Sequence, residues 1–214
     1  MRLALIVVGV LTLIVAANIA WRWTSRRRSL PCPSWLSWGV EGPFFSWLLR
    51  TETTLDRIHL HPGQRILEIG PGPGRLLRPA ARRISPGGEA VGIDIQAPMI
   101  ASLKARASNA GIDNLMGIVG DAAEAMAPGE YDVVLMALTL GEIPAARQLE
   151  ALEHAFGVLK PGGRLSITEM FPDPHFLSQK AVKRLAAAAG FQHQETLGSR
   201  WFHTSNFLRP ERQR

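Results

Sequence analysis

The stretch RILEIGPGPGRLL, residues 65–77, places three glycines and two prolines directly behind a short apolar run. Residues 65–69 have the apolar, partly β-branched character of a buried strand. A glycine-rich turn between a first strand and a first helix lets the backbone approach a ligand, because no Cβ stands in the way. The stretch therefore predicts a nucleotide-binding turn at the start of an α/β fold.

The spacing in this turn separates the nucleotide classes. The pattern is Glu-x-Gly-x-Gly-x-Gly, formed by Glu68, Gly70, Gly72 and Gly74. The dinucleotide fingerprint G-x-G-x-x-G would need a third glycine at Arg75, and the phosphate loop ending in Gly-Lys-Ser/Thr is absent. Pro71 and Pro73 also remove two backbone N–H donors that a pyrophosphate would use. The turn thus fits S-adenosylmethionine, which carries no phosphate, better than NAD.

Strand-like and helix-like segments alternate on the carboxyl side of this turn. Short apolar runs occupy 65–69, 90–95, 115–119, 131–136 and 164–170, and helical stretches occupy 75–84, 97–111, 146–160 and 181–190. Segments 191–198 and 201–208 are predicted as a terminal antiparallel strand pair. Such alternation is typical of a parallel sheet covered on both faces. We therefore expect a doubly wound α/β domain with a mostly parallel, seven-stranded, Rossmann-like sheet.

Residues 61–170 resemble a class I S-adenosylmethionine-dependent methyltransferase, closest in character to the ubiquinone/menaquinone-type and lipid methyltransferases (methyltransferase type 11 domain). Residues 60–74 resemble the first motif of that family with its lead-in, and VGIDI ends a second strand in Asp94, 26 residues after Glu68. GDA (120–122), YDVVLM (131–136) and LKPGGRL (159–165) match later motifs in order. Together, these five matches cover about half of the chain.

The resemblance implies a cofactor site for S-adenosylmethionine. It assigns Asp94 to the two ribose hydroxyls and Asp121 to the adenine amine, and it places their neighbours Ile95 and Ala122 at the cofactor as well. Glu68 would help to order the glycine turn and the amino group of the methionine part. A carboxylate suits a vicinal diol because it accepts two hydrogen bonds.

The N-terminal residues predict a membrane segment. Residues 3–20 carry no charge, and 18 helical residues span about 27 Å, close to the roughly 30 Å hydrocarbon core. Trp21, Trp23 and the arginines at 26–28 follow at once, as in an interfacial belt with a cytoplasmic basic flank. A cleaved signal peptide is the alternative, but its basic cluster would precede the apolar run. We expect a single-pass anchor over 1–25 with the domain of 51–210 on the cytoplasmic side.

Residues 26–50 form an aromatic-rich linker. Phe44, Phe45, Leu48 and Leu49 follow helical spacing. Two interpretations stay open: a helix packed on the domain core, or an interfacial helix that covers the mouth of the active site.

Composition and missing motifs exclude other classes. The chain has 214 residues, a net charge of +6 and one cysteine, so it forms no intramolecular disulfide and no cysteine-based zinc cluster. The positive charges are scattered, so we expect no nucleic-acid partner. His59 and His61 lack a metal-binding partner cluster, and we expect no metal. The only tyrosine, Tyr131, lacks the lysine four residues later that a short-chain dehydrogenase requires.

The sequence assigns no catalytic residue. Glu142, Glu169, Asp173 and His175 are the candidates for a general base near the ends of the fourth and fifth strands. We expect a membrane-anchored methyltransferase for a hydrophobic or lipid-like acceptor, either a quinone precursor or a phospholipid headgroup. Two alternatives stay open: a methyltransferase for small apolar or thiol acceptors, and a non-catalytic scaffold or sensor that binds S-adenosylmethionine.

Overall fold

The computed structural model describes residues 50–122, 124, 130–171 and 173–211, together with isolated positions among the first 24 residues. Within this described part of the chain, no helix is both long enough and apolar enough to cross a bilayer. Apart from those isolated positions and Arg50, the predicted membrane segment and the aromatic linker lie outside the described residues. Both therefore stay predictions.

Helices and strands alternate along most of the described chain, as expected. The elements are α4 (Thr51–Ile58), β1 (Arg65–Ile69), α5 (Leu77–Arg83), β2 (Glu89–Asp94), α6 (Ala97–Asn109), β3 (Leu115–Val119), β4 (Tyr131–Ala137), α7 (Gln148–Val158), β5 (Leu159–Met170), α8 (Gln179–Ala188), β6 (Gln192–Gly198) and β7 (Phe202–Leu208).

All seven strands form one mixed sheet in the order β3-β2-β1-β4-β5-β7-β6. The first five strands pair in parallel, and β7 pairs antiparallel with both β5 and β6. This confirms the predicted Rossmann-like sheet with its terminal antiparallel pair. The strand order reverses between β1 and β4, and in sheets of this kind a ligand crevice opens at the carboxyl ends of the strands where the order reverses.

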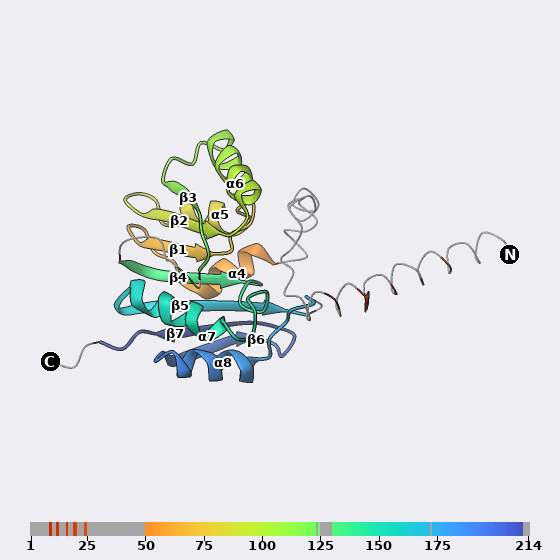
Figure 1. Cartoon of the computed structure of the whole chain (residues 1–214). Coiled ribbons are helices and arrows are strands. Elements are labelled where there is room, and N and C mark those ends of the chain that lie inside the picture. Colours follow the sequence, from red (N-terminus) through yellow and green to blue (C-terminus); the bar gives the residue numbers. More distant parts are fainter. Residues whose placement is uncertain are drawn as a thin grey trace.

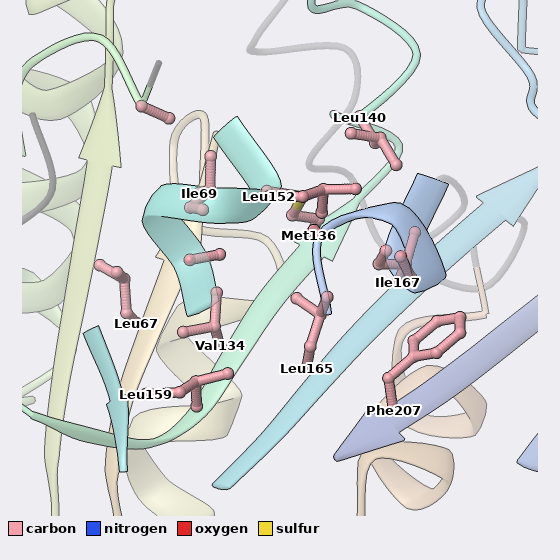
Figure 2. Close-up of a cluster of buried hydrophobic side chains, with 14 of the residues drawn as sticks. Leu67, Ile69, Val134, Met136, Leu140, Leu152, Leu159, Leu165, Ile167 and Phe207 are labelled. Atoms are coloured by element: carbon pink, nitrogen blue, oxygen red, sulfur yellow. The ribbon is translucent and has the colours of Figure 1, made fainter. Parts of the chain in front are cut away.

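Helices cover both faces of the sheet, and strand alternation sends side chains into two cores. On one face, Leu67, Val134 and Leu165 pack with α7 and α8, and Figure 2 shows this cluster around Met136 and Leu152. On the other face, neighbouring strand residues pack against the apolar sides of α4, α5 and α6. Figure 1 shows α5 and α6 beside the β1–β3 half, and α7 and α8 beside the β5–β6 half.

Two details differ from the sequence-based expectation. Strand β5 begins at Leu159 rather than at 164, because Leu159 pairs with Tyr131 before an irregularity in the β4–β5 register. The helix predicted over 146–160 is shorter, Gln148–Val158, and Gln148, Ala151, Leu152 and Ala155 form its buried face.

Candidate active site at the carboxyl ends of the strands

A cavity of about 480 Å³ opens at the carboxyl ends of β1, β2 and β4, where the strand order reverses. This volume is within the range of small-molecule sites. Seven of the eight predicted cofactor residues line it: Glu68, Gly70, Gly72, Asp94, Ile95, Asp121 and Ala122. The topology thus gathers residues that are up to 54 positions apart in the chain.

The glycine turn adopts a backbone that other residues rarely tolerate. Gly70, Gly72 and Gly74 all have positive φ angles, of 69°, 54° and 91°. A Cβ at Gly70 would collide with Thr139, whereas a Cβ at Gly72 would meet no atom within 4 Å. Gly70 is therefore required by close packing against the loop after β4. Gly72 is required by its backbone angle and faces open space.

Gly74 is the predicted cofactor residue that the structure places elsewhere. It is not among the cavity-lining residues, and a Cβ there would collide with Leu103 of α6. Its N–H donates to the Pro71 carbonyl at 3.0 Å, and its own carbonyl accepts from Arg78 N–H at 3.1 Å. Gly74 thus closes the turn onto α5 and α6 instead of facing the cavity.

Glu68 is a buried carboxyl group at the base of the cavity, only 2% exposed. Its Oε2 has no hydrogen-bond partner among the described residues. Burial raises the pKa of Glu68 to about 8, against the lowering effect of the Arg75 guanidinium, and nearby Asp94 adds to the rise. The carboxyl group is thus poised to ionise when a cation approaches Oε2.

Asp94 ends β2 and orders two backbone segments around the cavity. Its Oδ2 accepts from Gly72 N–H at 3.1 Å, and its Oδ1 accepts from Gln96 N–H at 2.9 Å. Burial raises the pKa of Asp94, while these two hydrogen bonds lower it. Each carboxyl oxygen keeps acceptor capacity for a hydroxyl group of a ligand.

Asp121 forms an ion pair that sequence reasoning missed. Arg147, immediately before α7, donates from Nη1 to Asp121 Oδ2 at 2.8 Å, and both residues line the cavity. Arg147 also lies 3.4 Å from Glu150 through its Nε. A basic residue such as Arg147 is disfavoured at the N-terminus of a helix, where the helix dipole is positive. Its place in the sequence was therefore a signal that an acidic partner lies nearby.

The loop after β4 forms another wall of the cavity. Leu138 has a φ of 61°, which is rare for a residue with a branched side chain, and its N–H donates to the Thr168 carbonyl at 2.9 Å. The hydroxyl of Thr139 lies 3.4 Å from the Gly70 carbonyl. The unusual backbone at Leu138 thus brings this loop onto the glycine turn.

The four candidates for a general base gather near the ends of β4 and β5. Glu142 and Asp173 line the cavity, whereas Glu169 and His175 are buried and do not line it. Glu169 Oε2 accepts from Leu177 N–H at 3.1 Å. Burial raises the pKa of Glu169 to about 8; the Leu177 hydrogen bond opposes this rise, and the nearby Asp173 and Glu142 carboxylates add to it.

His175 lies behind the cavity wall. Its Nδ1 is 3.9 Å from Asp173 Oδ1, and neither ring nitrogen has a hydrogen-bond partner in the described structure. Across residues 50–122, 124, 130–171 and 173–211, no three His, Cys, Asp or Glu side chains come together as a metal site. The cavity lining combines carboxylates, the guanidinium groups of Arg75 and Arg147, and apolar walls.

Part of the chain matches a known protein-family model. A family model described as "Methyltransferase domain" matches residues 66–163, from β1 into β5. The chain is 36% identical over 122 residues to nocamycin O-methyltransferase of Saccharothrix syringae. This alignment covers 56% of this chain and 42% of that protein. It is 33% identical over 135 residues to the ubiquinone/menaquinone biosynthesis C-methyltransferase UbiE of Cereibacter sphaeroides, covering 62% and 53% respectively. The chain thus spans about half the length of these relatives.

Solved structures share the fold. A SAM-dependent methyltransferase from Aquifex aeolicus superimposes with a TM-score of 0.76 at 20% identity, covering 83% of this chain and 99% of that one. The magnesium protoporphyrin IX methyltransferase ChlM from Synechocystis PCC 6803, solved with bound SAM, gives a TM-score of 0.61 at 18% identity, covering 76% and 80%.

Proposed function

We propose that this chain is a class I S-adenosylmethionine-dependent methyltransferase and that it methylates a hydrophobic, lipid-like acceptor at a membrane. The observation that carries this proposal is the cavity framed by the left-handed glycine turn, the buried Glu68 and the strand-end Asp94. When bound there, S-adenosylmethionine supplies a methyl group on a positively charged sulfonium.

The residues present fit this cofactor. Glu68 Oε2 is a buried acceptor without a partner in the described residues, and the ammonium of the methionine part would satisfy it. Gly72 leaves open space beside the Asp94 carboxylate, which would accept from the ribose hydroxyls. Asp121 would accept from the adenine amine and share its charge with Arg147.

The contribution of the protein to methyl transfer is alignment and the exclusion of water. An acceptor would enter over the carboxyl ends of β4 and β5, where Leu138 and Ile143 supply apolar walls. A dedicated base is needed only if the nucleophile starts protonated. Glu142 and Asp173, which line the cavity, are then placed to hold that proton.

Three observations support a membrane acceptor. Residues 3–20 are uncharged and long enough to span a bilayer. The cavity walls on the β4 side carry Leu138 and Ile143, which suit an apolar acceptor. The UbiE relatives are named for C-methylation in ubiquinone and menaquinone biosynthesis, which supports a quinone-like ring in particular. We place the domain on the cytoplasmic side of a single N-terminal anchor.

A second candidate is the methylation of a small, freely diffusing apolar acceptor. The likeness to an enzyme named nocamycin O-methyltransferase favours it. The two candidates differ in where the methylated product is found, because a lipid-like product stays with the membrane.

The test combines binding with product analysis. Calorimetry with S-adenosylmethionine should show binding that Asp94→Ala abolishes and that Asp113→Ala, an exposed acid outside the cavity, leaves intact. Membranes incubated with the protein and radiolabelled S-adenosylmethionine should then yield labelled lipid. Label confined to water-soluble metabolites would favour the second candidate. Binding without release of S-adenosylhomocysteine would make the protein a scaffold or sensor instead of an enzyme.

A further inference from the structure

Two large aromatic side chains are exposed where β5 ends and β7 begins. Phe171 is 48% exposed and Trp201 is 50% exposed, and their ring centroids lie 5.1 Å apart. The N–H of Phe171 donates to the Trp201 carbonyl at 2.7 Å, so the two rings are held together by the backbone. We call Phe171, Phe176, Trp201 and Phe202 the aromatic corner; Phe176 contacts Phe171 at 6.4 Å between centroids.

Positive charges surround the aromatic corner. The Arg200 guanidinium lies 4.8 Å from the centroid of Trp201, and Arg57 and Arg50 lie 4.5 and 5.4 Å from that of Phe202. The pKa of Arg57 is lowered, first by burial and then by the neighbouring Arg50 charge. Arg57 Nη1 is buried and has no hydrogen-bond partner in the described residues. A negatively charged partner would relieve this crowding of like charges.

The opening of α8 adds to the same surface. The Gln179 amide donates to the Ser199 carbonyl at 3.2 Å, which fixes the start of α8 beside the β6–β7 turn. Lys180 follows directly and is exposed. Exposed aromatic rings flanked by arginine and lysine are the composition that proteins use at an anionic lipid surface.

The position of Arg50 also supports a membrane-facing role for the aromatic corner. Arg50 precedes α4 and is the first residue of the continuously described body, and it stacks on Phe202 next to Trp201. The segment leading from the predicted anchor therefore enters the domain at the aromatic corner. The corner also lies at the edge where the cavity opens, because Asp173, two residues after Phe171, lines the cavity.

We propose that the aromatic corner is a membrane-docking surface that inserts Phe171 and Trp201 into the headgroup region of an anionic phospholipid bilayer. The cavity mouth then faces the bilayer, and a lipid-like acceptor reaches it without crossing water. This inference rests on the proposed function, because it concerns which side of the anchored domain meets the membrane.

The test measures lipid contact at single positions of the full chain. Trp201→Cys, Phe171→Cys and the control Met116→Cys are each made in a Cys32→Ser background, which removes the only cysteine. Met116 is 48% exposed on the edge strand β3, at the other end of the sheet, so it matches Trp201 in exposure. Each protein carries an environment-sensitive fluorophore on its cysteine and is reconstituted into phosphatidylcholine–phosphatidylglycerol vesicles containing spin-labelled lipid.

The expected result is a blue-shifted emission at 201 and 171, with quenching by the spin-labelled lipid about twofold or more stronger than at 116. The difference should shrink when phosphatidylglycerol is omitted or salt is raised, because the arginine contacts are electrostatic. Equal quenching at the three positions would overturn the proposal. So would a label at 201 that is shielded equally without lipid, since the corner would then be covered by another part of the chain or by a second copy.

Two controls keep this test separate from that of the proposed function. Calorimetry with S-adenosylmethionine checks that each labelled protein is folded, since none of the three positions lines the cavity. Flotation of the protein with vesicles tests the anchor. If high salt strips the chain from the vesicles but the labels at 201 and 171 contact the vesicles at low salt, the anchor is wrong and the docking surface stands.

Discussion

Binding of the cofactor should release a proton from Glu68, and the variant Glu68→Gln isolates this effect. In the free protein, burial raises the pKa of Glu68 to about 8, so the carboxyl group is mostly neutral at neutral pH. A ligand ammonium at the unpartnered Oε2 favours the ionised form. The cost of ionisation is therefore part of the free energy of binding, and it falls as pH rises toward 8.

The magnitude follows from the pKa. With a pKa of about 8, Glu68 is ionised in about one molecule in a hundred near pH 6 and in about one in eleven near pH 7. The dissociation constant for S-adenosylhomocysteine should then fall about ninefold between these two pH values. At the higher pH, the remaining penalty is about 1.4 kcal/mol.

The assay is isothermal titration calorimetry in two buffers of different ionisation enthalpy. The wild type should release close to one proton per bound ligand near pH 7, and Glu68→Gln should release markedly less and lose most of the pH dependence. Glu153→Gln, an exposed acid on α7, serves as the matched control and should behave as the wild type. If the pH dependence persists in Glu68→Gln, other groups carry it and the assignment of Glu68 to the ligand ammonium is refuted.

Three further substitutions test the packing and the buried charge. Gly74→Ala should destabilise the protein by about 1–3 kcal/mol in urea unfolding, because the new Cβ would collide with Leu103. Gly63→Ala is the control: Gly63 also has a positive φ, but a Cβ there would meet no atom within 4 Å, so the loss should be only about 1 kcal/mol. Glu169→Gln should flatten the pH dependence of stability. In the wild type, the raised pKa of Glu169 makes the free energy of unfolding fall as pH rises from about 4.5 toward 8. An unchanged slope in the variant would show that Glu169 does not cause this fall. Phe207→Ala should lower the free energy of unfolding by about 3–5 kcal/mol, because the side chain is fully buried on β7, the strand between β5 and β6. A loss below 1 kcal/mol would contradict its place in the core.

The fold was predictable because its signals are local. Strand periodicity, the glycine turn and the helix-ending glycines each depend on a few neighbouring residues, and their order along the chain implies a parallel sheet. The site was predictable as far as it sits at strand ends, since the topology brings Glu68, Asp94 and Asp121 to one edge. The start of β5 was misplaced because Pro161 and the glycines after it look like a turn, while the pairing of Leu159 with Tyr131 is a tertiary contact.

The remaining features depend on contacts between distant residues. Spacing identifies three glycines with special backbone angles but not which of them faces the cavity, and only packing against Leu103 assigns Gly74 to the interior. Arg147 and Asp121 are 26 positions apart and meet only after α7 has packed on the sheet. The gathering of acids near Glu169 likewise follows from the loops after β4 and β5 lying together.

The position of β7 has a consequence for biosynthesis. It is the last strand along the described chain, yet it lies between β5 and β6 within the sheet. When the ribosome has translated only as far as β6, the edge of β5 that bears Ser166 and Thr168 is unpaired. Strand β6 then also lacks β7, the strand with which it pairs. The sheet can therefore close only after residue 208 has emerged from the ribosome, and a nascent chain stalled before that point would expose an unpaired strand edge that favours aggregation.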